Sequence, residues 1–297
     1  MKFFFADNLD YVDPKYDFLT EDFRPNRRPQ IDDHYAHESL NEPPYDGLLV
    51  SRNVVGGAPY TGRYTKGQRY RFLRQGAAKF LRYPPSDRAN KLDYPIIGDC
   101  GSFSYIQAGF NYGVSIDHIN LQQNDSWDDS RLCPIKVSQR TEFSFHSAVE
   151  FWQLCQQKKV GFEPIGVVQS WSPRSAAGYA AKLVETGYRY IGLGGLSSHT
   201  TSRIYDVVAE VRAKIPDDIR LHLFGFNRLA QLDDFHGLNI TSFDSTSPLI
   251  RSFKDETNNY FAWPDSFKAI RIPSTLEAGL KRKTALCFAQ RDLTEKC

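Results

Sequence analysis

The sequence predicts an α/β protein folded as a (β/α)8 TIM barrel. Short β-rich runs alternate with longer helical patterns at about 25 to 30 residues per unit, which is the signal for parallel βα architecture. Eight such runs occur within 297 residues, and a TIM barrel uses eight strands in about 250 residues plus insertions. The whole chain, 1–297, is therefore expected to form one barrel domain.

The predicted strands are apolar or β-branched runs bounded by turn-forming residues. In chain order they are 2–7, 47–51, 94–99, 113–119, 162–169, 188–195, 219–225 and 239–244. Two polar segments, about 8–46 and 120–140, interrupt this order and are expected to be insertions.

Helices are predicted between the later strands. Residues 141–159 carry apolar residues at helical spacing, with Thr141 as the expected N-cap. The segment 172–187 runs from a Ser-Pro start to a Gly stop, the usual asymmetry of helix ends. The same logic predicts helices at 199–215 and 227–237.

The alternative architecture is an open, doubly wound sheet. Its usual phosphate fingerprint, G-x-G-x-x-G after the first strand, is missing from this sequence. The glycines of GLGGL at 192–196 lack that spacing and come late in the chain. The barrel is therefore favoured.

Composition indicates an ordinary soluble globular protein, with 24% charged and 41% hydrophobic residues. No run of about 18 apolar residues predicts a membrane span, and the start MKFFFADNLDY is too short and acidic for a signal peptide. The five cysteines match no disulfide framework. We therefore expect a reducing, cytoplasmic setting and no contact with a membrane.

A basic stretch stands out although the net charge is only +2. Between residues 63 and 82 there is no acidic residue, and the Lys and Arg positions are Arg63, Lys66, Arg69, Arg71, Arg74, Lys79 and Arg82. Aromatic residues lie among them. Such a stretch either binds phosphates or forms a solvated helix face above buried rings, and composition leaves both open.

Polar residues and glycines mark the carboxyl ends of the predicted strands, where a TIM barrel carries its chemistry. They are Asp99, Asp117, Gln169, Gly194, Gly195, Gly225 and Asp244. Each alone is explained by a cap, a turn or a surface amide. Together on one rim they predict a site in which two carboxylates act as nucleophile and proton carrier. A further carboxylate and an amide suit the polar edge of a planar base, and Phe103 is placed to stack on its ring.

Five motifs resemble the tRNA-guanine transglycosylase superfamily in order and spacing. They are DCGSFS (99–104), VVQSW (167–171), YIGLGGL (190–196), HLFGF (222–226) and SFDST (242–246). The Gly-Gly-Leu of the third motif is intact. Ser170-Trp171 stands where the family has Gly-Gly, and Ser245 stands where it has Cys. The resemblance spans residues 94–250.

The resemblance implies roles for individual residues. Asp244 would attack C1′ of a nucleotide and expel guanine, and Asp99 would carry the proton as general acid and base. Base recognition would involve Phe103, Asp117, Gln169, Gly194, Gly195 and Leu196. A 7-deazaguanine, such as 7-cyano-7-deazaguanine, would then displace the enzyme carboxylate without any metal or organic cofactor.

The chain departs from the tRNA enzymes at its carboxyl end, where they carry a structural zinc site. Only Cys287 and Cys297 occur there, and no histidine follows His236, so the spacing fits no common zinc pattern. His34 and His37 stand in a polar insertion and are expected to be solvated.

These departures resemble the DpdA-type DNA-guanine transglycosylases of phages and bacterial 7-deazaguanine DNA-modification clusters. That resemblance implies DNA as the partner and base exchange as the reaction. Phosphate contacts are expected from Arg63, Lys66, Arg69, Arg71 and Arg74, and from LKRKT at 280–284. A helper protein is also possible on this reading.

Other functions stay open at this point. The same chemistry could act on tRNA, or the barrel could be a non-catalytic subunit that binds nucleic acid. A glycoside hydrolase with paired carboxylates fits the chemistry in outline, although the ordered base-recognition motifs make it the weakest alternative.

Overall fold

The structure is a computed structural model of the chain, and eight parallel strands close into a barrel in it. It describes residues 1–7, 9, 11–20, 22–39, 45–56, 62–83, 94–99, 109–247, 251, 257–262 and 265–268. The strands follow the order β1-β10-β9-β8-β7-β6-β5-β4 around the barrel. Each barrel strand pairs with the barrel strand that follows it along the chain, and the first barrel strand pairs with the last. The predicted (β/α)8 fold is therefore confirmed.

Each predicted strand corresponds to one strand of the barrel. They are β1 (Lys2–Ala6), β4 (Gly47–Ser51), β5 (Ile96–Asp99), β6 (Tyr112–Val114), β7 (Glu163–Val168), β8 (Tyr190–Leu193), β9 (Arg220–Leu223) and β10 (Ser242–Ser245). The prediction was too long for β6, which ends at Val114, so Asp117 lies three residues beyond it in a loop.

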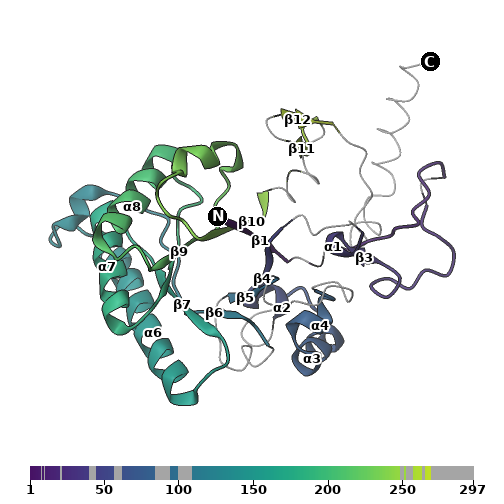
Figure 1. The fold of residues 1–297 in the computed structure, drawn as a ribbon, viewed down its shortest axis with the longest axis horizontal. Coiled ribbons are helices and arrows are strands. Elements are labelled where there is room, and N and C mark those ends of the chain that lie inside the picture. Colours follow the sequence, from purple (N-terminus) through teal and green to yellow (C-terminus); the bar gives the residue numbers. More distant parts are fainter. Residues whose placement is uncertain are drawn as a thin grey trace.

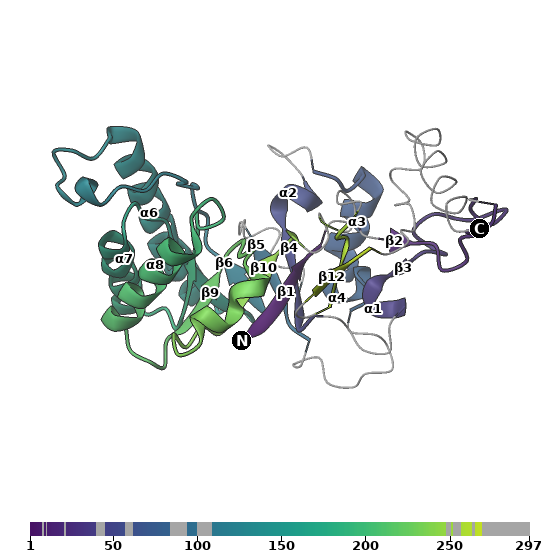
Figure 2. The same ribbon diagram turned by 90° about the horizontal axis from the view of Figure 1, so that it is seen from above.

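Helices pack around the barrel in two groups. One group holds α6 (Ile135–Lys158), α7 (Pro173–Thr186) and α8 (Thr201–Lys214); the other holds α2 (Arg52–Val55), α3 (Lys66–Gln75) and α4 (Ala77–Phe80). Figures 1 and 2 show the two groups on opposite sides of the barrel. The short helix η2 (Asp125–Asp128) precedes α6.

Two helix predictions were wrong in detail. Helix α6 begins after Pro134, so Thr141 is a buried residue inside the helix and not its N-cap. The segment after β9 forms the 3-10 element η3 (Leu229–Phe235), with a kink at Gln231, in place of an α-helix. By contrast, α7 has the predicted cap, because Ser172 Oγ accepts from the Ser175 amide at 2.9 Å.

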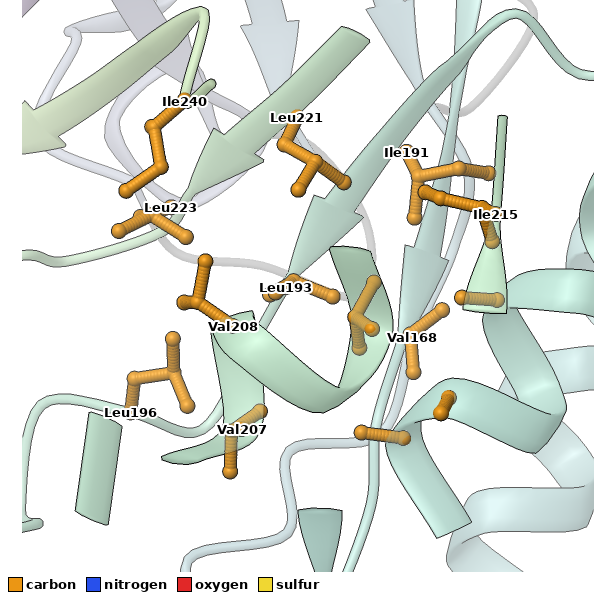
Figure 3. Close-up of a cluster of buried hydrophobic side chains, with 14 of the residues drawn as sticks. Val168, Ile191, Leu193, Leu196, Val207, Val208, Ile215, Leu221, Leu223 and Ile240 are labelled. Atoms are coloured by element: carbon orange, nitrogen blue, oxygen red, sulfur yellow. The ribbon is translucent and has the colours of Figure 1, made fainter. Parts of the chain in front are cut away.

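The strands read as apolar runs because both of their faces are buried. Outward residues of β7, β8 and β9 pack on α8, and Figure 3 shows Leu193 and Leu223 near Val208 of that helix. Inward residues fill the barrel itself: Phe4, Leu49, Ile97, Val114, Ile165, Val167 and Tyr190. This alternation leaves the inward positions at the carboxyl ends of the strands for polar side chains.

The segment between β1 and β4 carries the antiparallel strand pair β2 (Tyr11–Val12) and β3 (His34–Tyr35), followed by α1 (Ala36–Ser39). His37 is buried there and not solvated as expected. Its Nδ1 lies 2.6 Å from Tyr45 Oη and its Nε2 lies 3.1 Å from the carbonyl oxygen of Leu81. Burial lowers the pKa of His37 to about 4.

The described part of the chain closes with a small hairpin, β11 (Tyr260–Ala262) and β12 (Asp265–Phe267). Cys287, Cys297 and the basic run 280–284 lie outside the described residues. Across the described ranges, no helix combines the length and apolar character that crossing a membrane requires.

Candidate active site

Asp244 lies on β10 at an inward position, and one of its oxygens is held by two groups. Oδ1 lies 3.2 Å from Nε2 of His222 and accepts the Gly225 amide at 3.0 Å. The residue is 7% exposed. A buried carboxylate needs hydrogen-bond partners, and both partners here come from β9 or the turn that follows it.

Gly225 supplies its amide because of an unusual backbone conformation. Its φ is +65°, in the left-handed region that favours glycine. The turn directs the N–H back toward β10 and leaves the carboxylate seated at the barrel rim. A residue with a Cβ at position 225 would strain this turn.

A chain of polar groups runs below Asp244 through the barrel interior. Nδ1 of His222 lies 2.6 Å from Ser242 Oγ, and the same hydroxyl lies 2.5 Å from Tyr190 Oη. His222 and Ser242 are fully buried. Burial raises the pKa of Tyr190 to about 12, so its hydroxyl keeps its proton.

This series of hydrogen-bonded groups was not predicted from the sequence, although the HLFGF motif contains His222. A signal was present: residues 242 and 244 of one strand share a face because side chains alternate. The pairing of Ser242 with His222 puts the histidine beside them. That pairing follows only once the strand order is known.

The carboxyl ends of four adjacent strands form one row. Across β7 to β10 the register aligns Val168, Leu193, Leu223 and Phe243. The next residues along the four strands are Gln169, Gly194, Phe224 and Asp244. The structure therefore brings three of the predicted site residues, Gln169, Gly194 and Asp244, to the same level of the rim.

Gln169 joins the β7 end to the loop after β6. Its Nε2 donates to Asp117 Oδ2 at 2.5 Å, and its Oε1 accepts the Asn120 amide at 3.0 Å. The backbone donor fixes which end of the amide is the oxygen. Burial raises the pKa of Asp117, an effect opposed by the hydrogen bond from Gln169.

Two glycines let the chain approach this amide closely. A Cβ on Gly194 would stand 2.2 Å from Gln169 Nε2. A Cβ on Gly195, whose φ is +74°, would stand 2.3 Å from the Asn120 carbonyl oxygen. The following residue, Leu196, is buried in the core around α8. The Gly-Gly-Leu motif thus forms the wall next to Gln169.

A cavity of about 610 Å³ opens beside Asp117. Its lining comes from the loop after β6, from the start of α2 and from α6: Asn53, Asp117, His118, Ile119, Leu121, Gln122 and Arg140. A space of this size is in the range of small-molecule sites. Asp117 is the predicted site residue in this lining, so the space lies beside its carboxyl group.

Asp99 is the last residue of β5 and is half-buried. It pairs in register with Ser51 of β4. The inward parity of Ile97 places Asp99 on the inward face of the same strand. Phe103, the predicted stacking residue, lies outside the described residues.

The basic stretch forms α3 and the turns beside it. Thr65 caps α3 through a capping box with Gln68. Arg63, Lys66, Arg71 and Arg74 are exposed, whereas Arg69 is half-buried. The rings beneath the helix, Tyr64, Phe72 and Phe80, are buried and pack on one another at 5.1–5.7 Å between centroids. Tyr70 is the exception, at 66% exposed.

Most charges of this stretch point to solvent, whereas Arg82 pairs with Glu38 at 3.1 Å. Within the described ranges, no acidic side chain forms an ion pair with Lys66 or Arg74. The guanidinium of Arg74 lies 6.0 Å from the Tyr70 ring centroid. Buried rings below and exposed cations above fit the predicted solvated helix face, and phosphate binding by this helix stays a prediction.

The described residues include no group of three His, Cys, Asp or Glu arranged to hold a metal ion. Among the described residues, the side chains at the rim that could ligate a metal are carboxylates and an amide, and each of them contacts protein groups.

Comparison with known proteins decides the family. No family model matches the chain. The chain is 34% identical over 296 aligned residues to a protein named DNA-guanine transglycosylase from Salmonella montevideo, an alignment that covers 92% of this chain and 68% of that protein. The chain belongs to the guanine transglycosylase superfamily. It is a guanine transglycosylase, as the five motifs indicated, and the barrel rim described above is its candidate active site.

Proposed function

We propose that this guanine transglycosylase exchanges guanine in DNA for a 7-deazaguanine through a covalent intermediate on Asp244. The observation that carries the proposal is the seating of Asp244. Its carboxylate is buried at the rim with Oδ1 held by His222 and Gly225. It shares one register row with Gln169, the partner of Asp117.

Base recognition is assigned to Asp117 and Gln169. The edge of guanine and of 7-deazaguanine presents one carbonyl oxygen and two N–H donors. Because Asn120 occupies Oε1 of Gln169, the free hydrogen on Nε2 is the donor for the base carbonyl. The Asp117 carboxylate accepts from the ring N–H and the exocyclic amine. The bond between Gln169 and Asp117 keeps both groups paired before the base arrives.

The first half of the reaction breaks the bond between C1′ and N9 of guanine. An oxygen of Asp244 forms the new bond to C1′, the bonding electrons leave with N9, and Asp99 supplies the proton that neutralises the departing base. The second half runs in reverse with a 7-deazaguanine. Asp99 accepts its N9 proton, N9 attacks C1′, and Asp244 leaves as a carboxylate. No oxidant, reductant or metal enters the balance.

DNA is the proposed polymer on two grounds. The relative is named a DNA-guanine transglycosylase, and α3 exposes cations that suit phosphates. A guanine stacked in a duplex must be extruded to reach the rim, at a cost of a few kcal/mol. Phosphate contacts from Arg63, Lys66 and Arg74 would offset that cost.

The test is base exchange with a labelled base. Purified protein is incubated with duplex DNA or tRNA and labelled guanine or 7-cyano-7-deazaguanine, and label in the polymer is counted. Label in DNA supports the proposal. Label in tRNA alone would overturn the polymer and keep the chemistry. No label with any combination, from protein that binds DNA, would favour a non-catalytic barrel.

A further inference from the structure

We propose that His222, backed by Ser242 and Tyr190, is a positioning residue that selects which oxygen of Asp244 attacks and speeds departure of that carboxylate in the second half of the reaction. This inference rests on the proposed function, because it concerns the same nucleophile. It assigns a role to three buried residues, none of which lies at the rim itself.

Only one arrangement of protons satisfies the whole chain with neutral His222. As an oxygen of a carboxylate, Asp244 Oδ1 can only accept a hydrogen bond. Nε2 of His222 therefore carries the hydrogen. Nδ1 is then an acceptor and takes the Ser242 hydroxyl hydrogen at 2.6 Å. Ser242 Oγ in turn accepts the Tyr190 hydroxyl at 2.5 Å. Every donor points toward Asp244.

The surroundings keep the imidazole in this orientation. His222 is 0% exposed. Its ring centroid lies 4.4 Å from that of Phe224 and 6.0 Å from that of Phe4, both at steep interplanar angles. A ring packed on two sides and bonded at both nitrogens does not rotate freely. The tautomer and direction are therefore fixed before substrate binds.

Fixing Oδ1 leaves Oδ2 as the attacking oxygen. Both hydrogen bonds described for Asp244, from His222 and from the Gly225 amide, end on Oδ1. When Oδ2 bonds to C1′, Oδ1 becomes the carbonyl oxygen of an ester and can keep the same two donors. The nucleophile does not have to lose its hydrogen bonds in order to attack.

The two halves of the reaction respond differently to these donors. Hydrogen bonds to a charged carboxylate are roughly twice as strong as those to a neutral group. The carboxylate loses its charge when the ester forms and regains it when the incoming base displaces the ester. Donation from His222 therefore stabilises the leaving carboxylate in the second half, and its removal slows release more than formation.

The variants follow from the geometry. His222→Phe keeps a buried ring and removes the donor, whereas His222→Gln restores an N–H in its place. Ser242→Ala removes the hydroxyl that hydrogen-bonds Nδ1 of His222 and leaves the residues at the rim unchanged. Tyr188→Phe is the matched control for a buried tyrosine, since its hydroxyl bonds the Ala148 carbonyl at 2.7 Å outside the barrel interior.

The experiment follows the covalent DNA–protein adduct on denaturing gels beside the exchange rate. With His222→Phe we expect exchange on the order of 10- to 100-fold slower, the usual effect of losing a buried hydrogen bond to a charged group, while the fraction of enzyme trapped as adduct rises. His222→Gln should recover most of the release rate, and Tyr188→Phe should match wild type. Equal loss of adduct and exchange in His222→Phe, or no change in either, would overturn the proposal.

Ser242→Ala keeps the test decisive if His222→Phe does not fold. This variant should show a smaller rise in trapped adduct. An equal loss of adduct and of base exchange would again contradict the proposed role of His222. Failure of the proposed function looks different. In that case either wild type forms no adduct at all, or Asp244→Asn exchanges base as fast as wild type does.

Discussion

Gln169 donates through Nε2 to Oδ2 of Asp117 at 2.5 Å, joining the end of β7 to the loop after β6. The pair is preorganised without substrate, because Asn120 holds the other end of the glutamine amide. Two chain segments that are far apart in sequence thereby present one donor and one acceptor side by side. This arrangement suits the proposed recognition of a guanine edge, with Gln169 facing the carbonyl oxygen and the Asp117 carboxylate facing the two N–H groups.

Replacing Asp117 by Asn should weaken base use specifically. The amide cannot accept two N–H donors as the carboxylate does, so kcat/KM for free guanine should fall by on the order of 10- to 200-fold, equivalent to about 1–3 kcal/mol. The loss should appear in KM for the base, with DNA binding unchanged. A normal KM for guanine would contradict the assignment of Asp117 to the base edge.

The same carboxylate predicts an acid limb in the activity profile. Burial raises the pKa of Asp117, so it is protonated at a higher pH than an ordinary aspartate and then no longer accepts from the base. Base affinity should therefore fall as pH falls through that raised pKa. Measurement of KM for guanine against pH should show this limb in wild type and not in Asp117→Asn.

Gly194→Ala should damage the site far more than an equivalent change elsewhere. The new Cβ would stand 2.2 Å from Gln169 Nε2, so the amide must move and the pair with Asp117 must break. We expect at least a tenfold loss of kcat/KM, consistent with the cost of small displacements at a reacting site. Gly178→Ala is the control, since nothing lies within 4 Å of its Cβ and alanine favours helix α7 by up to about 1 kcal/mol. Equal activity of the two variants would contradict the account.

The double variant Lys66→Ala and Arg74→Ala should weaken DNA binding in a salt-dependent way. Both side chains are exposed on α3, and each phosphate contact contributes about 0.9 to the slope of log affinity against log salt. The slope should therefore decrease by up to about 2, with base KM unchanged. Arg189→Ala is the control, because Arg189 directly precedes β8 and so lies at the amino ends of the barrel strands, away from the rim at their carboxyl ends. An unchanged slope in the double variant would exclude α3 from the DNA interface.

Asp7→Asn should stabilise the fold at neutral pH. Burial raises the pKa of Asp7 from 3.8 to about 6, although Tyr64 Oη donates to it at 3.0 Å. Wild type therefore has its full stability below pH about 4 and loses up to about 3 kcal/mol as pH rises through 6. The variant lacks that loss, so urea unfolding should show it to be more stable at pH 8 and not at pH 4. The exposed Asp206→Asn should show no such pH-dependent gain, and an identical pH profile for Asp7→Asn and wild type would contradict the prediction.

Much of the architecture was predictable because parallel barrel strands are buried on both faces. That burial produces apolar runs such as the one ending at Asp244, and the end of each run marks the rim. The rule located Asp99, Gln169 and Asp244 from sequence alone. Asp117 was also found, although β6 ends three residues earlier than predicted.

The remainder depended on contacts between distant segments. His222 became visible only when β9 and β10 were paired, and its partner Tyr190 comes from a third strand. His37 was predicted to be solvated because its neighbours in sequence are polar. It is buried against distant segments, where its ring contacts Tyr83 and its Nε2 lies 3.1 Å from the carbonyl oxygen of Leu81, 44 residues away. Thr141 resembled a cap, but the N-cap of that helix is Pro134, about two turns earlier.

The most direct test of the central claim is transfer of labelled 7-cyano-7-deazaguanine into duplex DNA by wild type and Asp244→Asn, assayed together with formation of the covalent adduct. Asparagine keeps the size of the side chain and its oxygen but is a very poor nucleophile. We predict that wild type incorporates label and forms an adduct, while folded Asp244→Asn does neither, with exchange at least 10³-fold lower, as is common when a covalent nucleophile is removed. Exchange by Asp244→Asn at a rate near that of wild type would show that Asp244 is not the nucleophile.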